Sequence, residues 1–132
     1  QIARLKKMHT DANPDYEAQL RFFYDRLRET WEKFIEERLF AQVISRFQPQ
    51  VQTLRLKEAV IDDDLVSHVY FGMSEVSSYT GHDRPTGKGG ALAEPTECEK
   101  HLAAFTACLD EADTKSKAAI KSRDGKIKPM KA

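Results

Sequence analysis

A long amphipathic pattern in the first third of the chain limits the folds that this sequence can adopt. Between Tyr16 and Phe47, apolar side chains recur every three or four residues, and Pro49 follows the last of them. This spacing is typical of an α-helix with one buried face, and a proline disfavours helical backbone in the residue before it. Asn13-Pro14-Asp15 supplies a cap and a first turn. The sequence therefore predicts one helix over residues 14–47, with these side chains buried: Leu20, Phe23, Leu27, Trp31 and Phe34.

The remaining segments predict a mainly α fold with at least two shorter helices. Residues 1–10 are interpreted as the end of an incoming helix. Three aspartates at 62–64 predict the start of a second helix, because acidic side chains stabilise a helix N-terminus. Pro95 opens a third helix, in which Thr96 and Glu99 have the spacing of a capping box. Residues 50–61 contain an alternating stretch that predicts a short extended arm.

Length and charge favour one helical domain followed by a basic tail. The chain has 132 residues and a formal net charge of zero, and one domain is usual at this length. The zero hides an uneven distribution: residues 61–113 carry a net charge of −8 and residues 114–132 one of +6. We expect a single domain over 1–113 and a flexible tail over 114–132, because the tail is rich in lysine and has few apolar residues.

Cysteine usage and hydropathy predict a cytoplasmic protein. Cys98 and Cys108 fall in the same expected helix, about 15 Å apart along its axis. That separation excludes a disulfide between them, because bridged Cα atoms lie within about 7 Å. No apolar run approaches the roughly 20 residues of a membrane span, so we expect no membrane contact. The chain starts at Gln1 rather than methionine, and we interpret it as a piece of a larger protein.

Three residues are candidates for chemistry. Arg28 and Glu32 lie four apart on the long helix, where an ordinary surface salt bridge is the simplest interpretation. His82 lies in the expected loop 78–94, beside Asp83. A loop histidine is accessible and titrates near neutral pH. The other histidines fall on expected helices, where surface or core roles are the default.

The glycine-rich run Gly81–Gly89 (GHDRPTGKG) does not match a nucleotide-binding loop. Its spacing is one residue too long, Gly89 stands where a magnesium-binding Ser or Thr is needed, and no strand precedes it. We therefore expect no ATP binding by this chain alone. No pattern of cysteine and histidine predicts a zinc site, so neither a cofactor nor a metal is expected. Arg4 and His9 have the R-x4-H spacing of HEPN ribonucleases, which we attribute to chance.

Several motifs resemble a known family. They are the run YDRLRETWEKFIEERLFAQVISRF over 24–47, VQTLRL over 51–56, FGMS over 71–74 and GHD over 81–83. Together they resemble the C-terminal region of bacterial coiled-coil AAA/ABC-type ATPases, the group that includes the anticodon nucleases PrrC and RloC. The resemblance covers about residues 15–112.

The resemblance implies a HEPN-like helical bundle that is controlled by an ATPase head and cuts tRNA without a metal. In those nucleases an Arg-x3-Glu pair acts with a downstream histidine. Arg28, Glu32 and His82 are the matching positions, and they are the expected catalytic residues. RNA, the ATPase head and a second copy of the chain are the implied partners.

Three interpretations stay open. The chain is either this ribonuclease domain or a non-catalytic helical domain that completes or dimerises the ATPase head. A scaffold or DNA-repair adaptor is a third. The acidic middle region argues against RNA binding, because it repels phosphate.

Overall fold

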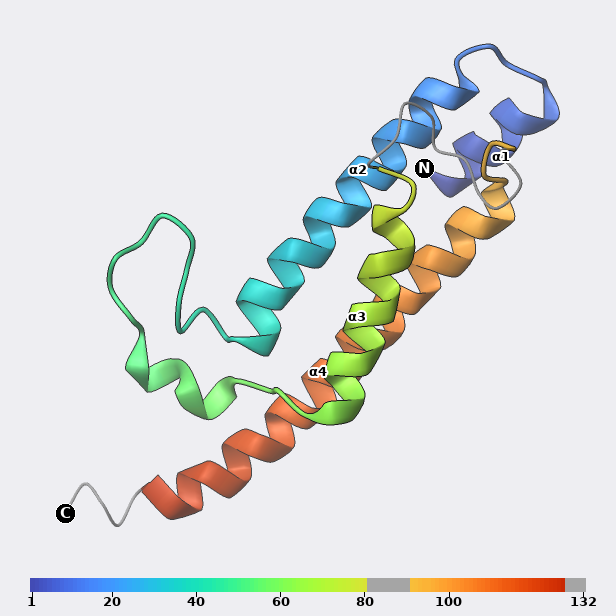
Figure 1. The fold of residues 1–132 in the computed structure, drawn as a ribbon. Coiled ribbons are helices and arrows are strands. Elements are labelled where there is room, and N and C mark those ends of the chain that lie inside the picture. The colour runs from blue at the N-terminus through green and yellow to red at the C-terminus, as the bar shows by residue number, and fades with distance from the viewer. Residues whose placement is uncertain (81–90, 128–132) are drawn as a thin grey trace. The chain divides into compact units, whose positions relative to one another are not determined.

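The computed structural model describes residues 1–80 and 91–127, and this part of the chain is helical without a strand (Figure 1). The prediction of a mainly α fold is confirmed. The chain forms two compact units. Unit 1 contains Gln1–Trp31 and Val69–Thr106, and unit 2 contains Glu32–His68 and Ala107–Ala132. The boundary between the units falls inside α2 (Tyr16–Phe34), α3 (Asp63–Ser77) and α4 (Pro95–Ile127).

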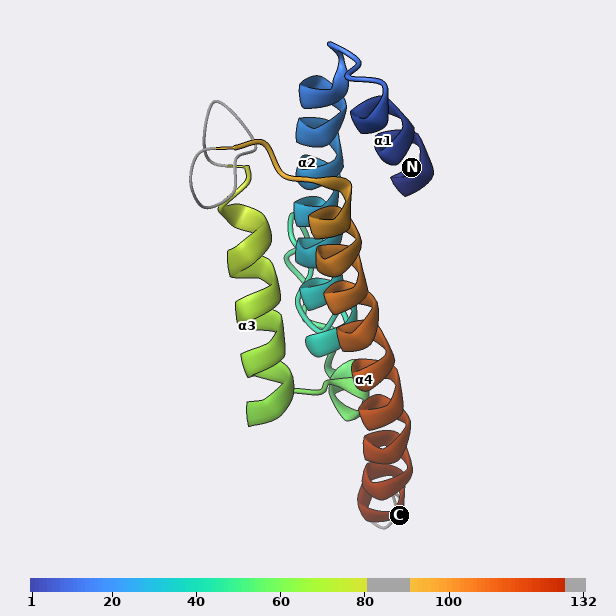
Figure 2. The same ribbon diagram turned by 90° about the vertical axis from the view of Figure 1, so that its right-hand side faces the viewer.

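In unit 1, α1 (Ile2–Thr10) turns back beside the start of α2 (Figures 1 and 2). The turn contains the predicted helix start, where the Asn13 side chain accepts a hydrogen bond from the Asp15 amide at 2.8 Å. An ion pair between Lys6 and Glu99 joins α1 to the first turns of α4. The expected helix over residues 1–10 is therefore present. The long helix, predicted to start at residue 14, starts at Tyr16.

The core of unit 1 is built around Trp31. Its side chain is fully buried and makes an edge contact with Phe105 at 5.0 Å between ring centroids. Gly72 on α3 packs so closely that an added Cβ would lie 2.5 Å from the Trp31 ring. Leu20, Phe23 and Leu27 are buried on the same helix, as predicted.

In unit 2, the long helix ends earlier than predicted. Phe34 is buried as expected, and a π-helix, η1 (Ile35–Leu39), then finishes the run. The Gln42 amide donates to the Glu36 carbonyl at 2.9 Å, and Ala41 and Gln42 have positive φ angles of 50° and 58°. This is a left-handed helix stop, formed here without glycine. The prediction of a helix through residue 47 is therefore wrong.

The expected extended arm over 50–61 is also wrong for its central part. Thr53–Glu58 forms a 3-10 helix, η2. Arg123 Nη1 donates to the carbonyls of Leu56, Lys57 and Ala59 at 3.1, 3.0 and 2.7 Å. These hydrogen bonds satisfy carbonyl groups at the end of η2. They come from a residue far away in the sequence, so an alternating pattern of apolar residues could not predict them.

The second and third helices begin where the sequence places them. The Asp62 carboxylate accepts from the Leu65 amide at 2.8 Å and so caps α3, and α4 begins at Pro95. The buried residues of α4 are Pro95, Cys98, His101, Cys108 and Ala112, whereas Leu102 is exposed. Both cysteines are free, which agrees with the excluded disulfide.

The basic tail differs most from its prediction. Residues 114–127 do not fray but continue α4 to Ile127. Ser116 donates to the Glu58 carbonyl at 3.1 Å, and Lys57 pairs with Asp124 at 3.2 Å. Contacts with 53–59 hold this segment as helix although it has few apolar residues.

None of the helices described combines the length and the apolar character required to cross a membrane.

Candidate functional site

Arg28 lies exposed on α2 in unit 1. Its Nη1 donates a hydrogen bond to the Thr80 hydroxyl, 3.4 Å away. Thr80 itself donates to the Ser77 carbonyl at 3.1 Å, which holds it at the C-terminal end of α3. The guanidinium is thus hydrogen-bonded to the last described residue before the segment 81–90, which contains His82.

Glu32 lies one turn further along α2 and belongs to an ion-pair cluster in unit 2. Arg46 Nη1 lies 3.3 Å from Glu32 Oε2, and Arg46 Nε lies 3.1 Å from Glu36 Oε2. The Arg46 amide also donates to Glu36 Oε1 at 3.0 Å. The amide and the guanidinium of Arg46 hold the pKa of the Glu36 carboxyl below its usual value. Arg46 thus holds the segment after η1 against the end of α2.

His82 and the run Gly81–Gly89 fall outside the described residues. The convergence of Arg28, Glu32 and His82 therefore stays a prediction. The structure places Arg28 and Glu32 one turn apart on α2, as the spacing indicates.

A buried polar network in unit 1 centres on His101. Its Nε2 lies 3.1 Å from Glu75 Oε2, and its Nδ1 lies 2.8 Å from the Tyr24 hydroxyl. A carboxylate can only accept, so Nε2 of His101 donates to Glu75. Both polar ends of the imidazole are satisfied. His101 therefore has the core role expected of a helical histidine, although its two partners were not predicted.

Tyrosines and a thiol surround this network. Tyr24 stacks on Tyr79 with 4.4 Å between ring centroids, and the Tyr79 hydroxyl donates to Glu97 at 2.7 Å. Burial raises the pKa of both phenols and raises the pKa of the Cys98 thiol to about 11. A thiol that stays protonated is a poor nucleophile, and Tyr24 and Cys98 are fully buried. The network is suited to holding helices together rather than to reaching a substrate.

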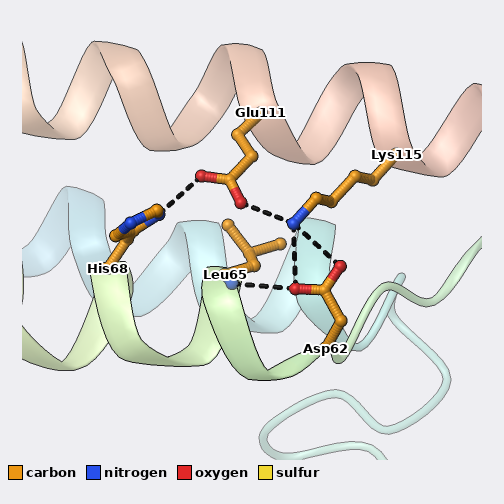
Figure 3. Close-up of polar contacts among 5 residues, drawn as sticks. All are labelled: Asp62, Leu65, His68, Glu111 and Lys115. Atoms are coloured by element: carbon orange, nitrogen blue, oxygen red, sulfur yellow. Dashed lines mark hydrogen bonds and ion pairs between the residues drawn. The ribbon is translucent and has the colours of Figure 1, made fainter.

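A second polar cluster, on the surface of unit 2, joins the start of α3 to α4 (Figure 3). Lys115 Nζ lies 2.8 Å from Asp62 Oδ2 and 2.6 Å from Glu111 Oε2. The other oxygen of Glu111 lies 2.7 Å from His68 Nδ1. Hydrogen bonds from the Lys115 ammonium are the main reason that the pKa values of the Asp62 and Glu111 carboxyls lie below their usual values. This is a chain of alternating charges on a partly exposed surface.

Within the described residues, no group of three or more His, Cys, Asp or Glu side chains is arranged to hold a metal ion.

His9 packs against the Tyr16 ring at 5.2 Å between centroids.

Comparisons with protein-family models, curated proteins and solved structures find no match to this chain. A functional proposal therefore depends on the geometry above and on the sequence motifs.

Proposed function

We propose that this chain is the C-terminal effector domain of a bacterial coiled-coil ATPase and that it cleaves RNA, with tRNA as the expected substrate. The observation that supports this is the hydrogen bond from Arg28 to Thr80. Thr80 stands two residues before His82 in the sequence. Arg28 is thus hydrogen-bonded to a residue two positions from His82 along the chain.

The three residues supply the groups that metal-free RNA cleavage needs. A base removes the proton of the ribose 2′-hydroxyl, the 2′-oxygen attacks phosphorus, and the bond to the 5′-oxygen breaks as an acid protonates that oxygen. An ionised Glu32 accepts a proton and so suits the base, which leaves the acid to His82. The Arg28 guanidinium can hold two phosphate oxygens as negative charge develops. The product is a 2′,3′-cyclic phosphate and a free 5′-hydroxyl.

The test is cleavage of bacterial tRNA by the purified chain, with both new ends mapped. Wild type should leave a cyclic phosphate, and addition of a metal chelator should not change the rate. Arg28→Ala and His82→Ala should each lower the rate by about 100-fold or more, the usual range for a lost acid, base or charge-stabilising group.

Arg26→Ala is the matched control. Arg26 is exposed on the same helix and lies over the Phe22 ring at 5.5 Å, and its loss should leave cleavage unchanged. Equal rates for wild type and His82→Ala would remove the ribonuclease proposal.

A second candidate function is a non-catalytic helical domain that completes or dimerises the ATPase head. The observation that favours it is a set of exposed apolar side chains after α2, the most exposed being Phe47 and Leu54. Protein surfaces rarely expose many such residues within one short segment without a partner. A chain that cleaves no tRNA but associates through this segment would fit the second candidate.

A further inference from the structure

One segment of unit 2, residues 40–56, presents an unusual amount of apolar surface to solvent; we refer to it as the docking segment. Phe47 is 101% exposed and Leu54 is 83% exposed. The full set of its exposed large apolar residues is Phe40, Ile44, Phe47, Val51, Leu54 and Leu56. In Figure 1 this part of the chain is the long loop after η1 together with the beginning of η2.

The exposed area is close to what one partner contributes to a stable interface. A free aromatic side chain presents about 150–250 Å². Six large side chains, each 44% or more exposed, therefore present on the order of 600 Å². A standard protein–protein interface takes about 800 Å² from each partner. The exposed apolar side chains of the docking segment would therefore supply a large part of the area that one partner contributes.

The docking segment also contributes to a pocket beside its exposed side chains. The pocket has a volume of about 450 Å³, and Ile35, Phe40 and Ile44 supply its apolar lining. Its charged lining comes from Glu32, Glu36 and Arg46. The pocket therefore combines an apolar lining with side chains of both charge signs, and Arg46 pairs with both glutamates.

The backbone holds the protruding side chain next to this pocket. Phe47 follows Arg46 directly in the sequence and has a φ angle of 65°. A left-handed conformation is unfavourable for a residue with a bulky side chain. Phe47 keeps this unfavourable backbone conformation although its ring is fully exposed and gains no burial from it. The segment thus carries a projecting aromatic ring and an apolar pocket on neighbouring residues.

We propose that a second copy of this chain covers the docking segment, with Phe47 of each copy occupying the pocket of the other. A two-fold interface uses the same surface twice, so it requires a surface that carries both complementary shapes. Phe47 and the pocket meet this requirement. Glu36 and Arg46 meet the same requirement for charge, because Glu36 of one copy would face Arg46 of the other across the two-fold axis. The proposal does not depend on RNA cleavage, and it gives the second candidate function its contact surface.

Sedimentation velocity over a range of protein concentrations tests the proposal. Wild type should change from monomer to dimer as concentration rises. Phe47→Asp removes the projecting ring, and Ile44→Asp places a charge in the pocket; each should weaken the dimer at least about 30-fold, as expected for a central interface residue. Both side chains are exposed, so circular dichroism and thermal unfolding should match wild type. Phe22→Asp, which changes an exposed phenylalanine of unit 1, is the matched control and should dimerise normally.

Mixing the two variants distinguishes this geometry from general stickiness. In the mixed pair, the intact Phe47 of the Ile44→Asp copy can enter the intact pocket of the Phe47→Asp copy. One of the two contacts is restored, so the mixture should dimerise more tightly than either variant alone. A wild type that stays monomeric at every soluble concentration, or a mixture no tighter than its components, would overturn the proposal. The tRNA assay is read separately, so failure of one proposal does not imply failure of the other.

Discussion

The two units of this chain differ in where their largest side chains and their polar contacts lie. Unit 1 fully buries Trp31 and Tyr24 and holds the buried His101 in hydrogen bonds inside its core, although it exposes Phe22, Tyr70 and Phe71. Unit 2 leaves Phe47 and Leu54 in solvent and relies on ion pairs at its surface, such as Arg38 to Asp113 at 2.6 Å. Surface pairs contribute little each, whereas burial of a large side chain contributes several times more. We therefore expect unit 1 to dominate stability and unit 2 to carry the surface for partners.

The largest expected effect comes from emptying the core of unit 1. Trp31→Ala removes a fully buried indole and should lower the free energy of unfolding by about 3–5 kcal/mol. The paired substitution in unit 2, Phe47→Ala, should change it by less than about 0.5 kcal/mol, because that ring is exposed. Urea denaturation of dilute monomer measures both. Similar losses for the two variants would break the contrast between the units.

Two glycine substitutions should change the free energy of unfolding by smaller amounts and in opposite directions. Gly72→Ala places a Cβ against the Trp31 ring and should destabilise by about 1–3 kcal/mol through overpacking. Gly125→Ala, on the exposed part of α4 in unit 2, meets nothing within 4 Å. It should stabilise by about 0.5–1 kcal/mol, because alanine favours a helix over glycine. Thermal unfolding of the two variants beside wild type gives the signs, and a stabilising Gly72→Ala would mean that the core yields more easily than the structure indicates.

The smallest effects should appear as different pH limits for the two units. In unit 1, burial raises the pKa of Cys98 to about 11, and the folded state keeps this proton after the unfolded state has lost it. Stability should therefore fall as the pH rises above about 9, and the raised pKa values of Tyr24 and Tyr79 extend the loss above pH 10. In unit 2, the lowered pKa values of Glu36, Asp62 and Glu111 mean that stability is lost as the pH falls below about 4.

Two probes separate these limits. Trp31 is the single tryptophan of the chain, and its fluorescence reports unit 1. Amide exchange of residues 53–68 reports unit 2. High pH should change the tryptophan fluorescence, and low pH should speed the amide exchange of residues 53–68. Tyr24→Phe should reduce the loss of stability at high pH and leave the response to low pH unchanged. Equal sensitivity of both probes to acid would show that the surface charge clusters do not stabilise unit 2 locally.

Helix starts were predictable from the sequence, because capping is local. Asn13 and Asp62 act through amides two or three residues away, and Pro95 fixes the backbone of its own turn. The buried face of α2 was predictable for the same reason, since a 3.6-residue period needs no knowledge of the partner. The starts of α2, α3 and α4 and the core role of Trp31 therefore follow from the printed residues.

Helix ends and polar partners were less predictable, because they depend on distant residues. The stop at Leu39 uses left-handed backbone at Ala41 and Gln42, where no glycine or asparagine signals it. Glu75 and Tyr24 meet at His101 although they are separated by many residues in the sequence. For the candidate site, the spacing placed Arg28 and Glu32 on neighbouring turns. It gave no indication that Arg46 pairs with Glu32, because that pairing requires the early helix stop.

The three hydrogen bonds from Arg123 to the backbone of residues 56–59 have a consequence for anyone who shortens this chain. A chain trimmed at residue 113 discards the donor that holds η2 in place. The carbonyls of Leu56, Lys57 and Ala59 would return to water, and the peptide bonds around them would become accessible to proteases. The end of α4 therefore protects a segment more than sixty positions earlier, and domain boundaries chosen from hydrophobicity alone would remove that protection.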